Sequence, residues 1–434
     1  MKDIKVKIED LGMDGEGIGR FEGKTCFVPF ALPDEEVKVE VVKEKGNLLF
    51  CKLKEVVKKS ESRAVSKCPY FKTCGGCTIE HLEYEKSLDF KTALVKNTIK
   101  KIAGEDVVVN KTVASDKNYG YRTKNVFPVF VMENKVVVGM YERGTRKIVE
   151  VSKCLLANEN INKTLNIVNE FLNSDKNIVL QAKNIKFVVV QSLGEQVVLT
   201  LVSTKMLKNL EKLIEMLSKT FSTFGVFVNI NQNKGGLILD GKLIHIAGIK
   251  CLKDESFKIK YEISPFSFMQ VNCDIKEKLY KRVLAEIKES DIVVDAYSGA
   301  GLLSSMIAKV AKQVVGIEIV KDAVINADKT KKENGILNLT NVLGDCKKEF
   351  NSVYKNYKPT VVVLDPPQKG VEEGLLLEIL KTQIEKIVYV SCNPKTLARD
   401  LKILLNNYKI KEIVPFDMFP NTAEVETVVV LKRK

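Results

Sequence analysis

The stretch IVVDAYSGAGLLSSMIA, residues 292–308, decides the fold because it reads as a buried strand, a glycine-rich turn and a helix. Gly299 and Gly301 let a ligand approach the backbone, and the start of the following helix offers free amide groups. Short apolar runs alternate with helical patterns on both sides of this stretch, and each run ends in a turn. This rhythm predicts an α/β fold, with a Rossmann-like doubly wound sheet over residues 263–434 and a site at the carboxyl ends of its strands.

Two acidic residues at later strand ends extend the signal of the glycine-rich turn. Glu318 ends the run QVVGIE, at the spacing where an acid binds the ribose hydroxyls of a nucleoside cofactor. Asp345 ends the run NVLGD and is a candidate partner for an adenine amino group. A dinucleotide fingerprint requires a third glycine, and Ser304 occupies that position. The combination therefore predicts S-adenosyl-L-methionine as cofactor, with Asp295 and Tyr297 of the turn among its contacts.

Three further turns carry groups suited to covalent chemistry on a pyrimidine. Cys392 follows KIVYVS and precedes Asn-Pro, where a turn exposes the sulfur and the next helix can lower its pKa. A thiolate that adds to carbon 6 of uracil makes carbon 5 nucleophilic toward a methyl sulfonium, and a base must then remove the carbon-5 proton. We predict Cys392 as nucleophile, Asp365 of LDPP as the group that anchors the ring, and Glu426 of ETVVVL as the base. The target nucleotide must be flipped out or single-stranded.

The stretch CPYFKTCGGC, residues 68–77, places three cysteines in a C-x5-C-x2-C pattern with two glycines between the last pair. Cys154, in VSKCLLAN, is the best candidate for a fourth ligand. Four thiolates suit either a structural zinc or a four-iron cluster. The first spacing differs from the C-x3-C-x2-C pattern of radical-generating clusters. We therefore predict a structural or RNA-positioning metal site at Cys68, Cys74, Cys77 and Cys154.

The composition favours a polyanionic partner. Lysine and arginine number 69 against 55 acidic residues, which gives a formal net charge of +14, and such a surplus favours binding to phosphates. Only two histidines are present, which argues against a histidine metal centre or a Ser-His-Asp triad. No apolar run reaches the length of about 18 residues typical of membrane spans. We predict a cytosolic protein, monomeric, that binds RNA and no membrane.

The chain divides into three predicted domains. Residues 1–57 alternate apolar and polar positions between glycine-rich turns, which predicts a small OB-like barrel. Residues 58–262 begin with a polar linker and the cysteine cluster, and continue as an α+β domain with helices expected at residues 82–102 and 205–220. Residues 263–434 form the catalytic domain described above.

Together these motifs resemble the RNA uracil-5-methyltransferase family, whose members make 5-methyluridine in tRNA and 23S ribosomal RNA. The resemblance covers nearly the whole chain and rests on CPYFKTCGGC, SPFSFMQVN, DPP, SCNP and FPNTAEVE. It implies that the amino-terminal barrel is a TRAM domain and that the four cysteines hold a four-iron, four-sulfur (4Fe-4S) cluster. It implies that Gln270 contacts the cofactor, and it assigns Asp365, Cys392 and Glu426 to catalysis. Because the cluster is typical of the ribosomal RNA branch, it favours 23S rRNA over tRNA.

Three positions depart from the family pattern. Ser298 stands where cysteine is common, Gln368 follows DPP where arginine is usual, and Glu424 stands where histidine is usual. Glu424 and Glu426, two apart on a strand, are expected to point the same way and to raise each other's pKa. The alternatives left open are the same chemistry on tRNA, methylation of cytosine, and an RNA-binding protein without turnover.

Overall fold

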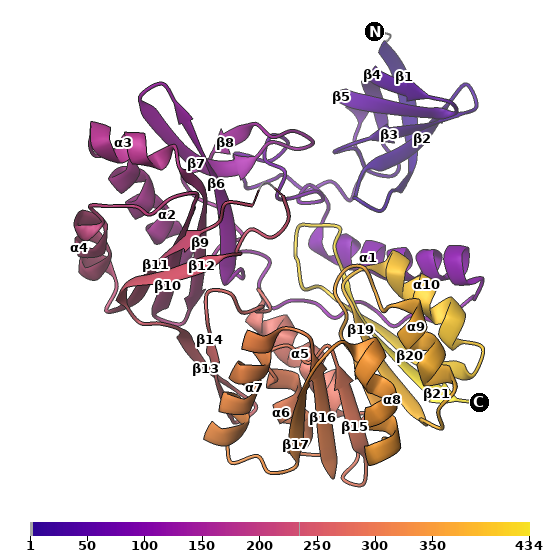
Figure 1. The fold of residues 1–434 in the computed structure, drawn as a ribbon. Helices are drawn as coiled ribbons and strands as arrows, with labels where there is room; N and C mark the ends of the chain where they lie inside the picture. Colours follow the sequence, from indigo (N-terminus) through magenta and orange to yellow (C-terminus); the bar gives the residue numbers. More distant parts are fainter. Residues whose placement is uncertain (1–2, 234) are drawn as a thin grey trace.

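The computed structural model describes residues 3–233 and 235–434, so the first two residues of the predicted domain 1–57 lie outside it. Five strands at the amino end close into a barrel in the order β1-β2-β3-β5-β4, at the upper right of Figure 1. Ile4, Val6 and Ile8 of β1 are buried while the residues between them are exposed, as strand geometry requires. The small barrel is confirmed. Its strands are β1 (Asp3–Leu11), β2 (Gly17–Phe21), β3 (Lys24–Val28), β4 (Glu36–Lys45) and β5 (Leu48–Lys58).

The central part is a seven-stranded sheet in the order β12-β11-β10-β9-β6-β7-β8. Three helices share a single apolar core with one of its faces, and a hairpin packs on the other. The helix expected from residue 205 begins only at Glu211, because Asn209 has a φ of 56°, outside the helical region. The elements are β6 (Lys124–Met132), β7 (Lys135–Tyr141), β8 (Ile148–Glu150), β9 (Ile185–Leu193), β10 (Gln196–Ser203), β11 (Thr223–Ile230), β12 (Lys242–Gly248), α2 (Glu159–Leu172), α3 (Lys176–Ala182), α4 (Glu211–Thr220) and the hairpin β13 (Leu252–Ser256) and β14 (Ile259–Ile263).

The carboxyl-terminal part is a second seven-stranded sheet, in the order β17-β16-β15-β18-β19-β21-β20. Neighbouring strands from β17 to β19 are parallel, whereas β21 runs antiparallel to both β19 and β20. Val293 and Val294 belong to the cores on opposite faces, so helices cover both sides (Figure 1). The strands are β15 (Ile292–Ala296), β16 (Gln313–Glu318), β17 (Leu339–Leu343), β18 (Val361–Leu364), β19 (Lys386–Ser391), β20 (Tyr408–Phe416) and β21 (Glu426–Arg433). The helices are α5 (Cys273–Leu284), α6 (Leu302–Ala308), α7 (Lys321–Glu333), α8 (Cys346–Tyr357), α9 (Glu373–Leu380) and α10 (Pro394–Leu404).

Helix α1 (Tyr84–Ala103) joins the second sheet although it precedes the central sheet in the chain. Its Val95 and Ile99 are buried in the same core as α8, α9 and α10, and Figure 1 shows α1 beside α10. The boundaries at residues 58 and 263 stay a prediction, because the chain crosses between the two sheets more than once. Among the described residues, no helix has both the length and the apolar character needed to cross a bilayer.

Candidate active site

The second sheet brings the predicted nucleophile, anchor and base to one edge. Ser391 of β19 pairs with Thr427 of β21, so the antiparallel register, carried one residue further, puts Cys392 across from Glu426. Strand β18 lies beside β19 and parallel to it, so Asp365, which follows β18, ends at the same edge. The three side chains therefore share one site.

The acids at this edge are poorly solvated, which raises their pKa values. Burial raises the pKa of Asp365 to about 7. Burial, followed by repulsion from Asp365 and Glu424, raises the pKa of Glu426 to about 8. A carboxylate with a pKa near the working pH suits a general base.

Glu424 differs from its predicted placement. Strand β21 begins only at Glu426, so Glu424 lies in the loop before the strand, where it is exposed while Glu426 is buried. Its charge nevertheless raises the pKa of Glu426. The two acids therefore interact across the rim of the site, and they do not share a strand face.

The thiol of Cys392 is also less acidic than the sequence suggested. Burial, and then the charges of Glu426 and Asp365, raises its pKa to about 12. Helix α10 does begin two residues later, with Asn393 as its cap accepting from the Lys395 amide at 3.0 Å. The expectation that this helix lowers the pKa is wrong, because burial and the acids contributed by other strands outweigh it.

The glycine-rich turn is shaped differently at its two glycines. Tyr297, before them, has a φ of 69°, and its amide donates to the Ile317 carbonyl at 3.0 Å. A Cβ added to Gly299 would meet no atom within 4 Å, so space lies open above that residue. A Cβ on Gly301 would lie 2.6 Å from Ala327 Cβ. Gly299 thus leaves room for a ligand, whereas Gly301 lets α7 pack closely.

The predicted cofactor acids lie at the strand ends around this turn. The carboxylate of Glu318 accepts from the amides of Gly299 at 3.0 Å and Val320 at 2.8 Å. Asp345 caps α8 and accepts from the Lys347 amide at 2.9 Å. Gln270 is buried in the segment that leads into α5. Their contacts to a cofactor stay predictions.

Asp295 carries a buried acceptor atom that is suited to a ligand. Ser304 donates a hydrogen bond to its Oδ2, while its buried Oδ1 has no partner among the described residues. Burial, against that hydrogen bond, raises its pKa to about 7. A buried acceptor without a partner is costly, so a donor or a positive charge from a ligand fits here. The open space at Gly299 and this acceptor together suit a cationic nucleoside cofactor.

A groove of about 500 Å³ leads to Cys392 and is shared by all three parts of the chain. Its walls include the barrel turn, the cysteine loop, two arginines of the central part and the segments around Cys392, namely Met13, Asp14, Gly75, Gly76, Thr78, Leu94, Arg122, Arg143, Gln368, Cys392, Asn393, Pro394, Lys395, Thr422, Ala423, Glu424 and Val425. Sequence reasoning missed Arg122 and Arg143, because no motif connects the central part to this groove. Both arginines are part of the wall of this groove.

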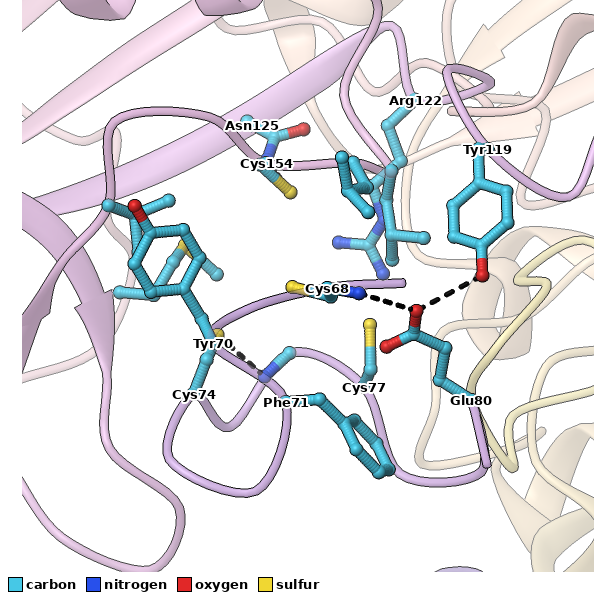
Figure 2. Close-up of a pocket in the computed structure, with 15 residues that line it drawn as sticks. Cys68, Tyr70, Phe71, Cys74, Cys77, Glu80, Tyr119, Arg122, Asn125 and Cys154 are labelled. Carbon is cyan, nitrogen blue, oxygen red and sulfur yellow. Dashed lines mark hydrogen bonds between the residues drawn. The ribbon is translucent and has the colours of Figure 1, made fainter. Parts of the chain in front are cut away.

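The four predicted metal ligands line a second cavity, which shares Gly76 and Arg122 with the groove (Figure 2). The Cys68 amide and the Tyr119 hydroxyl both donate to Glu80, at 3.1 and 3.0 Å, and the Gly76 amide donates to Cys74 Sγ at 3.3 Å. Burial raises the pKa of the three clustered thiols, Cys68, Cys74 and Cys77. In the part of the chain that the structure describes, no three His, Cys, Asp or Glu side chains converge closely enough to hold a metal ion.

Comparison with known proteins decides the family. Residues 83–434 match the sequence profile of the tRNA (uracil-5-)-methyltransferases, and residues 2–54 match that of the TRAM domain. The chain belongs to the RNA uracil-5-methyltransferase family. As a member, it is an S-adenosylmethionine-dependent RNA uracil-5-methyltransferase with an amino-terminal TRAM domain.

Relatives of this methyltransferase match over almost their full length. An uncharacterized RNA methyltransferase of Clostridium acetobutylicum is 34% identical, over 99% of this chain and 97% of the relative. One of Caldanaerobacter subterraneus is 35% identical, over 99% and 98%. The crystal structure of Pyrococcus abyssi tRNA (uracil-54, C5)-methyltransferase in complex with S-adenosyl-L-homocysteine has a TM-score of 0.80 and 27% identity, and it covers 98% of this chain and 99% of its own.

Proposed function

We propose that this enzyme methylates carbon 5 of a uridine in RNA through a transient bond between Cys392 and carbon 6. The observation that carries the proposal is the register that sets Cys392 across from Glu426, with Asp365 at the neighbouring strand end. A nucleophile, an acid and a buried base then face one planar ring. The groove leading to them carries Arg122, Arg143 and, in the first turn of α10, Lys395, which suits an RNA strand.

The residues act in a fixed order in this mechanism. The glycine-rich turn and Asp295 would hold S-adenosylmethionine, which when bound would supply an electrophilic methyl group. The Cys392 thiolate adds to carbon 6, which places negative charge on carbon 5 and makes it the nucleophile for methylation. Glu426 then takes the carbon-5 proton, the bond between sulfur and carbon 6 breaks, and the thiolate is regenerated. Asp365 holds the ring by hydrogen bonding to its amide edge.

We propose 23S rRNA as the first substrate, because the cysteine cluster resembles that of the ribosomal RNA branch. tRNA is the second candidate, because the Pyrococcus abyssi enzyme, named for uridine 54 of tRNA, matches 98% of this chain, barrel included. We further propose a cytosolic monomer in which residues 1–57, 58–262 and 263–434 act as domains.

We propose that the cysteine cavity holds a four-iron, four-sulfur cluster. Four thiols line it, a backbone amide already donates to one sulfur, and Arg122 on its wall offers a positive charge to an anionic cluster (Figure 2). Four thiolates also suit a structural zinc, which metal content and colour distinguish from a cluster. A broad brown absorbance near about 400 nm in anaerobically purified protein, lost in Cys77→Ser, supports a cluster. A colourless protein containing zinc contradicts it.

The substrate experiment uses purified protein, labelled S-adenosylmethionine and unmodified transcripts of 23S rRNA and of tRNA. Label recovered in 5-methyluridine from rRNA supports the first candidate, and label from tRNA supports the second. Cys392→Ala should bind RNA without turnover, and RNA containing 5-fluorouridine should form a covalent adduct, because fluorine cannot leave as a proton. Full activity of Cys392→Ala, or an active enzyme that forms no adduct, contradicts the covalent route.

A further inference from the structure

The cysteine loop (residues 68–80) is hydrogen-bonded directly to the segment that leads to the base. We name residues 417–425, between β20 and β21, the catalytic segment. The amides of Thr78 and Ile79 donate to the Asn421 carbonyl at 3.1 and 3.2 Å. In return, the amide of Ala423 donates to Thr78 Oγ1 at 2.9 Å. These bonds join two segments more than 300 residues apart in the chain, one beside the cysteine cavity and one beside Cys392.

The catalytic segment is held in an uncommon conformation from outside. Asn421 has a φ of 68°, in the left-handed region that asparagine tolerates but that still costs free energy. Its side chain donates to the Asn118 carbonyl at 2.7 Å, and the hydroxyl of Tyr121 donates to the Pro420 carbonyl at 3.0 Å. Such a conformation persists only where neighbouring groups fix it. The cysteine loop supplies part of that restraint.

The turn between β1 and β2 of the barrel packs against Thr78 and Ile79 of the cysteine loop. Gly15, in the turn between β1 and β2, has a φ of 78°, and a Cβ there would lie 2.4 Å from Ile79 Cγ2 and 3.4 Å from Thr78 Oγ1. The same Cβ would lie 3.6 Å from the Cβ of Ala423. The barrel turn, the cysteine loop and the catalytic segment therefore meet at Thr78, on the wall of the groove.

We propose that Thr78 is a positioning residue for methyl transfer, and that the cysteine loop acts on the reaction through it. Thr78 fixes the backbone at Ala423, three residues before Glu426, and so sets where the base stands relative to Cys392. A change in the conformation of the cysteine loop would then reach Glu426 through these hydrogen bonds. The inference rests on the proposed roles of Cys392 and Glu426.

The test compares three variants of the full-length protein. Thr78→Val keeps the shape of the side chain but removes the acceptor for the Ala423 amide, and Thr78→Ser keeps the hydroxyl. Thr73→Val is the matched control, because Thr73 is exposed in the same loop and donates only to the Tyr70 carbonyl, at 2.9 Å. A small misplacement of a catalytic group costs up to about 100-fold in rate, so we expect kcat of Thr78→Val to fall about 10- to 100-fold. The KM of Thr78→Val for RNA should stay close to the wild-type value. The kcat values of Thr78→Ser and Thr73→Val should also stay close to wild type.

Hydrogen exchange provides a readout that needs no turnover. Thr78→Val should raise amide exchange in residues 417–425, and Gly15→Ala, which forces a Cβ against Ile79, should do the same from the barrel side. Thr73→Val should leave that exchange at its wild-type level. Equal kcat in Thr78→Val and wild type, equal losses in Thr78→Val and Thr73→Val, or unchanged exchange in residues 417–425 would each overturn the proposal. A wild-type protein that makes no 5-methyluridine would instead remove the proposed function, and the exchange result would still stand.

Discussion

Replacing Glu424 with glutamine should move the pH dependence of proton abstraction to lower pH. Glu424 is exposed at the rim of the groove, and its negative charge helps to raise the pKa of Glu426 to about 8. A base must be ionised to act, so the rate should rise with pH up to that value and then level off. Removing the nearby charge makes ionisation of Glu426 easier and shifts the rise toward acid.

The size of the shift follows from the exposure of Glu424. Charge pairs at the surface are worth about 0.2–1 kcal/mol, which corresponds to about 0.1–0.7 pH units at about 1.4 kcal/mol per unit. With a pKa of about 8, roughly one Glu426 in ten is ionised at pH 7. The variant should therefore be about 1.3- to 4-fold faster than wild type at pH 7 and no faster above about pH 9.

The assay is release of tritium from RNA labelled at carbon 5 of uridine, in single turnovers from about pH 6 to 9.5. The matched control is Glu289→Gln, which removes an exposed acid near the opposite end of β15 and should leave the profile unchanged. A profile that keeps rising tenfold per unit above about pH 9 would indicate that ionisation of the thiol, with its pKa of about 12, controls the rate. That result, or an alkaline shift in Glu424→Gln, would refute the reasoning.

Three further predictions concern stability and binding. The pKa of Glu426 is raised from 4.5 to about 8 in the folded protein, so the folded state binds more protons than the unfolded state between those pH values. The free energy of unfolding should therefore fall as pH rises through that window. Thermal melts at several pH values should show a smaller fall in Glu426→Gln than in wild type. Gly301→Ala places a Cβ 2.6 Å from the Cβ of Ala327, and such overpacking should lower the free energy of unfolding by about 1–3 kcal/mol. It should also weaken the binding of S-adenosylhomocysteine, as measured by calorimetry. Unaltered binding and an unaltered melting temperature would contradict the close packing. Lys91→Met removes the only cation that pairs with the fully buried Asp417 among the described residues, and an unpaired buried charge costs about 3–5 kcal/mol; an unchanged melting temperature would contradict a stabilising role for this ion pair.

Local pattern was enough to predict the parallel half of the catalytic sheet. Asp365 and Cys392 each follow a short apolar run, and the carboxyl ends of parallel strands share an edge, so their proximity follows from the sequence pattern alone. The same reasoning failed at residues 205–210. Leu207 and Leu210 are buried and continue the apolar pattern. The left-handed backbone at Asn209 nevertheless keeps these residues out of the helix, which begins only at Glu211.

The rest depends on contacts between distant segments, which a single sequence does not encode locally. Nothing near Glu426 indicates that its strand inserts between β19 and β20 in antiparallel register. For the same reason, the residues next to Cys392 in the sequence indicate that a helix begins there. They do not indicate that Glu426 and Asp365 lie nearby and raise the pKa of Cys392. Arg122 and Arg143 reach the groove from the central part, and only the folded chain brings them there.

Because β21 inserts between β19 and β20, the strand pairing that completes the sheet also places Glu426 across from Cys392. Strand β20 precedes β21 in the chain but lies at the outer edge, so β19 keeps an unpaired edge until β21 enters beside it. A folding intermediate that lacks β21 would hold the sulfur of Cys392 without the carboxylate of Glu426. In the proposed mechanism, a methylated adduct formed without that carboxylate could not lose its carbon-5 proton, so assembly of the last strand pair also completes the group that releases the product.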